Sequence, residues 1–350
     1  MDPSLPSDDP ERAPRPLWID TDLGVDDLMA ILMVRAAGRP VDGCSLVFGN
    51  APLPRVLANA AAFAATFDWA VPLYAGAERA LVAPLSTATD VLGDSGMPSR
   101  GRRLDERRLA PVGRDAPDAF AAWLDGVGAP PDVLALGPLT NLARVATAHP
   151  ERFARIRRLV WMGGAATRGN HTPSAEFNAF ADPEALDVVA RSGVPFEMLD
   201  LDVCRQVTIG PEDLLALERI DTPRGRLLHD LVGGYLDIGL SRGRGSMSLY
   251  DPVAAAALLV PTVIEFERVA LRVDCSGSPS AGRTVLGGSA TDARTTEARG
   301  VTTTSAAGDA PTPRRGPFVD IGRAADAAAI RTRLFDALER AAKAPDENTR

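Results

Sequence analysis

A short apolar segment near the N-terminus, Leu17–Ile19, leads directly into four aspartates within eight residues: Asp20, Asp22, Asp26 and Asp27. Carboxylates so close behind a buried strand repel one another unless a cation neutralises them. An all-oxygen cluster without a nearby Cys or His favours Ca²⁺ or Mg²⁺ over zinc. An acidic helix N-terminus accounts for Asp26 and Asp27 through the helix dipole, but not for Asp20 and Asp22. The segment therefore predicts a strand, a turn and a divalent metal site.

Short apolar runs alternate with helical patterns along the chain. This alternation predicts the α/β class, with an open, mostly parallel, Rossmann-like sheet flanked by helices. Strands are expected at 17–20, 41–48, 71–74, 133–136, 159–162 and 195–199. Helices are expected at 26–37, 54–67, 115–126, 139–148, 183–191, 211–219, 224–240, 252–259 and 324–342. Ligands of such sheets bind at the carboxyl ends of the strands, where most polar clusters of this sequence fall.

The chain has 350 residues, a length that α/β proteins often fold as one domain. We expect a single domain at 17–342, preceded by a flexible N-terminal arm at 1–16 and followed by a tail at 343–350. Residues 276–316 are rich in Gly, Ser, Thr, Ala, Arg and Pro and poor in large apolar side chains. That composition predicts a mobile, low-complexity loop.

Composition excludes several classes of partner. The net charge of −8 argues against nucleic acid, which calls for a basic face. The N-terminus lacks a basic and apolar leader, and no apolar run reaches the roughly 18 residues of a membrane span. The three cysteines, Cys44, Cys204 and Cys275, form no CxxC pattern and suggest reduced thiols. We therefore expect a soluble, cytoplasmic protein without a membrane or nucleic-acid partner.

Further polar motifs follow the later strands. Gly49-Asn50 ends the second strand, although Gly-Asn is also a common turn pair. Leu136-Gly-Pro-Leu-Thr-Asn141 and Trp161-Met-Gly-Gly each end another strand, and the loop after the second of them supplies Asn170, Glu176 and Asn178. Leu249-Tyr-Asp-Pro252 adds a carboxylate, Asp251, at a helix start. Amide and carboxylate groups at this density suit a polyhydroxylated ligand, since each hydroxyl both donates and accepts.

Together these motifs resemble those of the inosine–uridine-preferring nucleoside hydrolase family, with gaps, from about residue 17 to 275 and weakly in the final helix. The resemblance implies the nucleoside hydrolase fold and an N-ribosyl hydrolase. Such an enzyme uses Ca²⁺ to hydrolyse the N-glycosidic bond of ribonucleosides to ribose and free base, in nucleoside catabolism and purine salvage. Its partner is a small-molecule nucleoside, and a homodimer or homotetramer is expected.

The resemblance also implies roles for individual residues. One Ca²⁺ is expected to be held by Asp22, Asp27, Asp251 and the backbone carbonyl of Leu136, with Asp20 as a further ligand or a support. Asp22 is expected to act as the general base that accepts a proton from water. The expected substrate-binding residues are Asp26 and Asn178 for the ribose 2′- and 3′-hydroxyls, Asn50, Asn170 and Glu176 for the remaining sugar oxygens, and Met162 beneath the ring.

The chain departs from its relatives where the base leaves. Many family members have a His directly before the last metal Asp, and here that residue is Tyr250. A second His of pyrimidine-preferring members matches Leu92. The aromatic rings of Tyr250 and Tyr235 are therefore expected to stack on the base, as in the purine-specific branch of the family. This arrangement predicts a preference for purine nucleosides.

Three histidines remain as possible proton donors. His149 precedes a proline at a helix end and is expected to be structural. His171 lies in the sugar-binding loop and is expected to point away from the base. His229, on the helix predicted at 224–240, is expected near the base pocket and is a candidate acid.

Two alternatives compete with this hypothesis. Asp20-Thr-Asp22 also resembles the Asp-x-Asp of haloacid-dehalogenase phosphatases, but that pattern requires Thr or Val where this chain has Gly24. It also gives the downstream Asn and Glu residues no role. The second alternative is a catalytically weak homologue that binds nucleosides or ribose but lacks the leaving-group His. The retention of every expected metal and sugar ligand argues against it.

Overall fold

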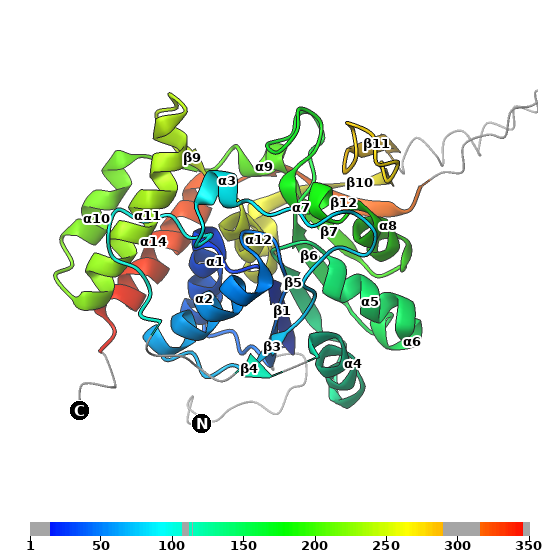
Figure 1. The fold of residues 1–350 in the computed structure, drawn as a ribbon, viewed down its shortest axis with the longest axis horizontal. Helices are drawn as coiled ribbons and strands as arrows, with labels where there is room; N and C mark the ends of the chain where they lie inside the picture. Colours follow the sequence, from blue (N-terminus) through cyan, green and yellow to red (C-terminus); the bar gives the residue numbers. More distant parts are fainter. Residues whose placement is uncertain (1–14, 107–111, 114, 290–315, 346–350) are drawn as a thin grey trace, which may run out of the picture.

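A mostly parallel sheet forms the centre of the molecule (Figure 1). The computed structural model describes residues 15–106, 112–113, 115–289 and 316–345. Within these residues the sheet has ten strands in the order β11-β10-β12-β7-β6-β5-β1-β2-β3-β4. Adjacent strands from β12 to β4 pair in parallel, whereas β10 is antiparallel to both of its neighbours, β11 and β12. The predicted α/β architecture is confirmed.

The strands of this sheet are β1 (Leu17–Thr21), β2 (Gly43–Leu46), β3 (Leu73–Ala75), β4 (Val112–Gly113), β5 (Asp132–Ala135), β6 (Arg158–Met162), β7 (Phe196–Leu199), β10 (Ile264–Val273), β11 (Thr284–Ser289) and β12 (Phe318–Ala325). A separate two-stranded sheet pairs β8 (Thr208–Ile209) with β9 (Met247–Ser248). All six predicted strands are present, as β1, β2, β3, β5, β6 and β7.

The described helices are α1 (Val25–Ala36), α2 (Leu53–Thr66), α3 (Thr89–Leu92), α4 (Ala116–Gly126), α5 (Thr140–Ala148), α6 (Pro150–Phe153), α7 (Phe177–Ala181), α8 (Pro183–Arg191), α9 (Leu201–Cys204), α10 (Leu214–Glu218), α11 (Pro223–Ser241), α12 (Asp251–Leu259) and α14 (Ala327–Lys343). The helix predicted at 211–219 is divided into a 3₁₀ turn, Pro211–Asp213, and α10. The last helix begins later than predicted, because β12 extends to Ala325 and Asp326 caps α14 by accepting the Ala329 N–H.

The two faces of the sheet pack against different helices, which explains why β1 is buried throughout. Leu17 and Ile19 belong to the core shared with α1, α11, α12 and α14. Trp18 points to the opposite face and packs in the core of α4, α5 and α8, beside Phe120 and Leu142. Successive strand residues face opposite sides of a sheet, so a strand covered on both faces is apolar throughout.

The low-complexity stretch contains a structured segment. β11 pairs with β10, with Leu286 opposite Leu271, and the Thr284 side chain is buried. The prediction that all of 276–316 is a mobile loop is therefore wrong for β11, because an edge strand is held by backbone hydrogen bonds and needs few large apolar side chains. Residues 290–315 and most of the predicted N-terminal arm and C-terminal tail lie outside the described residues.

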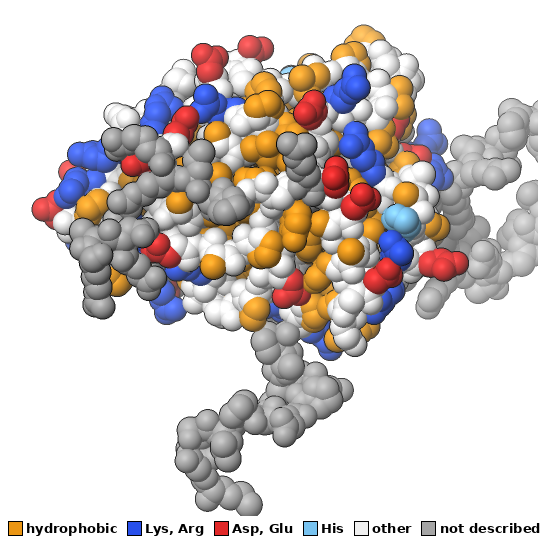
Figure 2. Space-filling view, turned by 60° about the horizontal axis from the view of Figure 1, so that its bottom comes forward, with side chains coloured by type: hydrophobic (Ala, Val, Ile, Leu, Met, Phe, Trp, Pro, Cys, Tyr) orange, Lys and Arg blue, Asp and Glu red, His pale blue; other side chains and the backbone are white. Residues whose placement is uncertain are grey.

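The topology fixes where a ligand can bind. β1 is flanked by β2 on one side and by β5 on the other, so the chain reverses its direction of sheet growth at β1. Such a switch point leaves a crevice at the carboxyl ends of the strands. No described helix has the length and hydropathy needed to span a membrane. On the face drawn in Figure 2, acidic and basic side chains are interspersed among apolar ones.

Candidate active site

A cavity of about 440 Å³ lies at the carboxyl ends of the central strands. Its floor is formed by residues at or after the ends of β1, β2, β5 and β6, among them Asp22, Asn50, Leu136 and Met162. Its walls come from α3 and the residues before it, the loop that leads into α7, and the segment between α11 and α12. In Figure 1, α3, α7 and β9 lie together in the upper part of the molecule. A volume of this size is typical of a site for one small molecule.

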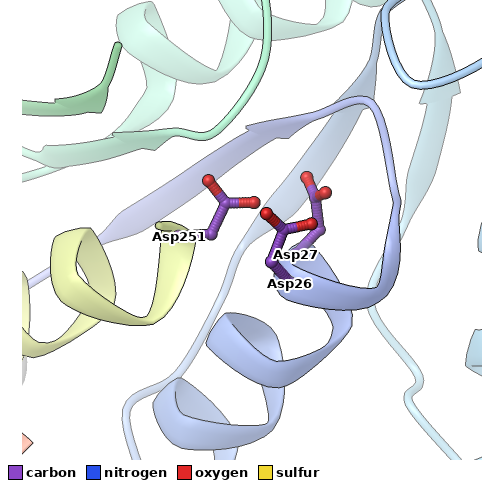
Figure 3. A group of neighbouring side chains, drawn as sticks. All are labelled: Asp26, Asp27 and Asp251. Carbon is purple, nitrogen blue, oxygen red and sulfur yellow. The ribbon is translucent and has the colours of Figure 1, made fainter. Parts of the chain in front are cut away.

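Three carboxylates converge at this floor from two helix starts (Figure 3). Asp26 and Asp27 lie in the first turn of α1, Asp251 begins α12, and one oxygen from each lies within 4.8 Å of the others. None of the three forms an ion pair with a cationic side chain of the described residues. Carboxylate oxygens arranged in this way are the ligands that a hard divalent cation prefers. The chemistry of this donor set fits Ca²⁺. The cluster contains Asp27 and Asp251, which were predicted to be ligands, together with Asp26, which was predicted to bind the sugar.

Burial and the closeness of the carboxylates raise the pKa values of these aspartates. Burial, together with the negative charge of Asp27, raises the pKa of Asp26 to about 7. Burial, and then the charge of Asp27, also raise the pKa of Asp22 and of Asp251 well above the usual range of an aspartate. Without a cation, the cluster therefore retains protons at a pH where exposed aspartates are ionised.

Asp22 is oriented by the residue pair that ends β2. Its carboxylate accepts the Asn50 backbone N–H at 2.7 Å and the Asn50 Nδ2–H at 2.9 Å. Gly49 is required here, because a Cβ at this position would lie 1.9 Å from Asp22 Oδ2. The Gly49-Asn50 turn thus fixes the carboxylate that was predicted to be the general base.

The carboxylates of Asp27 and Asp20 accept hydrogen bonds from neighbouring groups of the protein. Asp27 accepts hydrogen bonds from Thr21 Oγ1, from the Gly24 N–H at 2.8 Å and from Asn50 Nδ2 at 3.1 Å. Asp20 is fully buried below the floor, outside the cavity lining, where Ser45 and Asn141 donate to Oδ1. Its other oxygen, Oδ2, has no hydrogen-bond partner among the described residues. Asp20 was predicted to be a further ligand or a support, and its burial below the lining is the position expected for a support.

The predicted sugar-binding residues line one side of the cavity. Glu176 caps α7, accepting the backbone N–H groups of Gly164, Asn178 and Ala179 at 2.8 to 3.0 Å. Burial raises the pKa of Glu176 to about 7, despite these three donors. Asn170 Oδ1 accepts the Phe177 N–H at 3.0 Å. The Asn170 amide nitrogen therefore remains as the donor that a ligand can use.

Asn178 joins two strand ends. Its Nδ2 donates to the carbonyl of Leu136 at 3.0 Å and to the carbonyl of Met162 at 3.1 Å. Leu136 lines the cavity, and its carbonyl, predicted to be a metal ligand, already accepts one hydrogen bond. A carbonyl oxygen has two lone pairs, so one remains for a cation.

Three of the four predicted base-pocket residues, Leu92, Tyr235 and Tyr250, line the cavity. The Tyr235 hydroxyl donates to the Ser248 carbonyl at 2.8 Å and lies 3.5 Å from Asp26 Oδ2. The Tyr250 hydroxyl makes no hydrogen bond to the described residues.

The prediction for His229 is wrong, since this residue lies outside the cavity lining and its Nδ1 is 3.2 Å from Asp230 Oδ1. His229 and Tyr235 are six residues apart on α11, which places them on different faces of the helix, because each residue turns an α-helix by about 100°.

Sequence reasoning missed several wall residues. His171, expected to point away from the base, lines the cavity and packs against Phe180 and Phe177, with ring centroids 4.3 and 5.5 Å apart. Partial burial lowers the pKa of His171. The other missed residues on the lining include Thr87, Asp90, Arg168, Arg205, Arg242 and Arg244. Asp90 lies in the single turn of α3, and the others lie in irregular segments, so that no periodic pattern marked any of them.

Comparison with known proteins gives consistent results. Residues 17–328 match the family model described as inosine-uridine preferring nucleoside hydrolase. The non-specific ribonucleoside hydrolase RihC of Klebsiella pneumoniae (strain 342) is 35% identical over 272 residues, covering 77% of this chain and 88% of the relative. RihC of Salmonella enteritidis PT4 is 35% identical over 269 residues, covering 77% and 86%.

Solved structures show the same similarity. The plant nucleoside hydrolase PpNRh1 is 25% identical with a TM-score of 0.77, covering 93% of this chain and 99% of the plant chain. The purine-preferring ribonucleoside hydrolase of Gardnerella vaginalis is also 25% identical with a TM-score of 0.77, covering 94% and 99%. The similarity therefore extends over nearly the whole length of both solved chains.

Proposed function

This chain belongs to the inosine-uridine preferring nucleoside hydrolase family and is an N-ribosyl hydrolase, and we propose that it is a Ca²⁺-dependent enzyme with a preference for purine ribonucleosides. The products are ribose and the free base. The observation that carries the proposal is the convergence of Asp26, Asp27 and Asp251, of which Asp26 and Asp251 line the cavity together with the oriented carboxylate of Asp22.

Asp22, Asp27, Asp251 and the Leu136 carbonyl would hold the cation, with Asp20 as a support below them. A Ca²⁺ ion in this place would lower the pKa of water and attract the vicinal hydroxyls of ribose. The buried, mutually repelling carboxylates support this assignment, since a divalent cation removes the electrostatic cost of ionising them.

Asp22 accepts the proton of the attacking water as the general base. Asn50 holds its carboxylate with two hydrogen bonds, so that no reorientation is needed when the proton moves. Asp26 and Asn178 bind the 2′- and 3′-hydroxyls of ribose. Asn170, Glu176 and Asn50 bind the remaining sugar oxygens, and Met162 lies beneath the ring.

Cleavage of the N-glycosidic bond develops positive charge on the sugar, as in glycoside hydrolysis in general. A floor of carboxylates and amide oxygens stabilises that charge. The walls are suited to the base, because Tyr250 and Tyr235 both line the cavity and present aromatic side chains. These rings support the purine preference, since a purine has the larger stacking surface.

The test is a measurement of free ribose released from inosine, guanosine, adenosine, uridine and cytidine. We expect release from the purine nucleosides to be fastest, to stop after treatment with EDTA, and to return on addition of Ca²⁺. Faster turnover of uridine or cytidine would contradict the purine preference, and full activity in EDTA would contradict the metal. Tight nucleoside binding without ribose release at high enzyme concentration would instead indicate the binding-only homologue.

Two further properties rest on the sequence, the location on its three cysteines without a CxxC pattern and the assembly on the family resemblance. We propose a cytoplasmic location and a homodimeric or homotetrameric assembly. Sedimentation velocity at micromolar concentration tests the assembly, and a monomer at that concentration would contradict it.

A further inference from the structure

Two arginines on one wall of the cavity have no part in the chemistry described above. Arg242 and Arg244 follow α11, and both line the cavity. Neither guanidinium forms a hydrogen bond or an ion pair with the described residues. We propose that Arg242 and Arg244 bind the acceptor edge of the base and select 6-oxopurine nucleosides, inosine and guanosine, over adenosine. This inference rests on the proposed function and specifies its substrate.

The proposed sugar contacts determine which wall faces the base. Asp26 binds the 2′-hydroxyl and Asn178 the 3′-hydroxyl, and Asn170 and Glu176 bind the oxygen at C5′. In ribose the carbon next to C2′ is C1′, which carries the base. The base therefore lies on the Asp26 side of the sugar, where the Tyr235 hydroxyl is 3.5 Å from Asp26 Oδ2.

The two arginines lie on this same wall. α11 carries Tyr235 and Ile238, which both line the cavity, and it ends at Ser241 directly before Arg242. The backbone N–H groups of Arg242 and Arg244 each donate to the carbonyl of Gly239 at 3.1 Å. The turn between them depends on Gly243, with a φ of 70°, a conformation that glycine adopts without strain. This turn keeps both side chains at the cavity end of α11.

Arg244 is also close to the aromatic ring proposed to stack on the base. Burial raises the pKa of Tyr250, and the positive charges of Arg205 and Arg244 oppose that rise. Arg205 already binds within the protein, to Asp202 Oδ1 at 3.2 Å and to the carbonyls of Arg168 and Gly169 at 3.0 and 3.1 Å. Arg242 and Arg244 are thus the guanidinium groups of this wall that remain available to a ligand.

A guanidinium has donors in a planar fork and no acceptor. A 6-oxopurine presents two adjacent acceptors, O6 and N7, which arginine binds in a bidentate manner. Adenine places an amino donor beside N7, so the second hydrogen bond is lost and two donors face each other. When the C1′–N9 bond breaks, its electron pair goes to the base. A cation at N7 and O6 stabilises that charge, so part of the selectivity is expected in kcat.

The experiment compares kcat/KM for inosine, guanosine and adenosine in the wild type, Arg242→Gln, Arg244→Gln and the double variant. The wild type should favour both 6-oxopurine nucleosides over adenosine by at least about 10-fold. In the double variant, kcat/KM for inosine should fall by about 10- to 100-fold, the range expected for one or two bidentate contacts. The kcat/KM of the double variant for adenosine should remain within about threefold of the wild type, because adenosine does not form the bidentate contact that the variant removes.

Arg168→Gln is the matched control, because Arg168 lines the same cavity from the loop that leads into α7. It should leave the ratio of inosine to adenosine turnover unchanged. The proposal is overturned if the double variant keeps the wild-type ratio, or if the wild type hydrolyses adenosine as well as inosine.

A substrate without an acceptor edge separates this inference from the proposed function. 4-Nitrophenyl β-D-ribofuranoside carries a good leaving group without the adjacent O6 and N7 acceptors. The double variant should hydrolyse it at close to the wild-type rate. If the wild type with Ca²⁺ releases no ribose from this compound or from any nucleoside, the ribosidase proposal itself fails. If ribose is released but the variants do not alter the inosine to adenosine ratio, only the role of Arg242 and Arg244 fails.

Discussion

Asn50 binds both oxygens of the Asp22 carboxylate, through its backbone N–H at 2.7 Å and its Nδ2–H at 2.9 Å. The two residues are 28 positions apart and meet because β1 and β2 are adjacent, parallel strands that end at the same edge of the sheet. Hydrogen bonds to an ionised carboxylate favour its charged form. Burial and the charge of Asp27 raise the pKa of Asp22, and the hydrogen bond from the Asn50 backbone N–H opposes that rise. Asn50 therefore both orients the proposed base and favours its reactive state.

Replacing Asp22 by Asn should abolish most turnover while leaving the fold intact. The amide cannot accept a proton from water, and loss of a general base costs about 10²- to 10⁴-fold in rate. Initial rates of ribose release and the circular dichroism melting curve measure the two effects. Asp336→Asn, an exposed position on α14, is the control and should change neither. A variant at Asp22 with near-normal rates would show that another group is the base.

Gly49→Ala should reduce kcat by displacing Asp22. The new Cβ would lie 1.9 Å from Oδ2 and 2.7 Å from Cγ of Asp22, so the carboxylate has to move out of its hydrogen bonds with Asn50. A misplacement of about 1 Å at a reacting group costs on the order of 10²-fold. Gly128→Ala is the matched control, because no atom lies within 4 Å of its added Cβ. An unchanged kcat in Gly49→Ala would mean that the position of Asp22 is not critical.

The floor of the site was predictable because it is encoded locally. Each floor residue follows directly after an apolar run, and the carboxyl ends of parallel strands must meet at one edge. Asp22, Asn50 and Leu136 were all placed correctly at the cavity by this reasoning. Asp251 was found from its motif, since α12 starts with the carboxylate itself.

The walls and the sheet edge were not predictable in the same way. α3 is a single helical turn, and Arg242 lies in an irregular turn, so neither has a periodic pattern to detect. The first half of β10 alternates charged and apolar residues, for example Glu265, Phe266 and Glu267, because the strand lies near the edge of the sheet. That pattern differs from the continuous apolar runs of the central strands.

Asn178→Ala should mainly weaken substrate binding. The variant removes the proposed 3′-hydroxyl contact and the hydrogen bonds that Asn178 Nδ2 donates to the carbonyls of Leu136 and Met162. We expect KM for inosine to rise by about 10-fold and stability to fall by about 1–3 kcal/mol. Asn59→Ala is the control, since the Asn59 side chain is also buried and donates to one carbonyl, that of Ser95 at 2.8 Å. It should lose stability without a change in KM, which separates the two effects.

Tyr250→Phe should retain activity within about threefold, because the proposed role of Tyr250 is the stacking of its ring. Its hydroxyl makes no hydrogen bond to the described residues, so its removal leaves no partner unsatisfied. Tyr250→Leu should instead reduce kcat/KM for inosine by about 10-fold, in line with loss of an aromatic contact. A loss of 100-fold or more in Tyr250→Phe would assign the hydroxyl a direct part in protonating the base.

The metal-free protein should be less stable at pH 8 than at pH 5.5. Burial raises the pKa of Glu176 from 4.5 to about 7, and that of Asp20 from 3.8 to about 7. Burial, with the charge of Asp27, raises the pKa of Asp26 from 3.8 to about 7. For each group, the lower value is the pKa in the unfolded chain and the higher value is the pKa in the folded protein. At a pH between the two, the folded protein binds more protons than the unfolded chain, so the free energy of unfolding falls as the pH rises. The contribution of these three groups is lost as the pH rises through about 7, and the raised pKa values of Asp22 and Asp251 continue the loss at higher pH.

Bound Ca²⁺ should oppose this loss of stability at high pH. Its carboxylate ligands must be deprotonated, so Ca²⁺ binds more tightly as the pH rises. We therefore expect addition of Ca²⁺ to raise the melting temperature of EDTA-treated protein more at pH 8 than at pH 5.5. Differential scanning calorimetry of the chelated and the Ca²⁺-loaded protein at both values measures the four melting temperatures. Asp251→Asn should reduce the stabilisation by Ca²⁺ at pH 8, whereas Asp336→Asn should preserve it. An equal Ca²⁺ response at both pH values would show that the cation does not bind to these buried carboxylates.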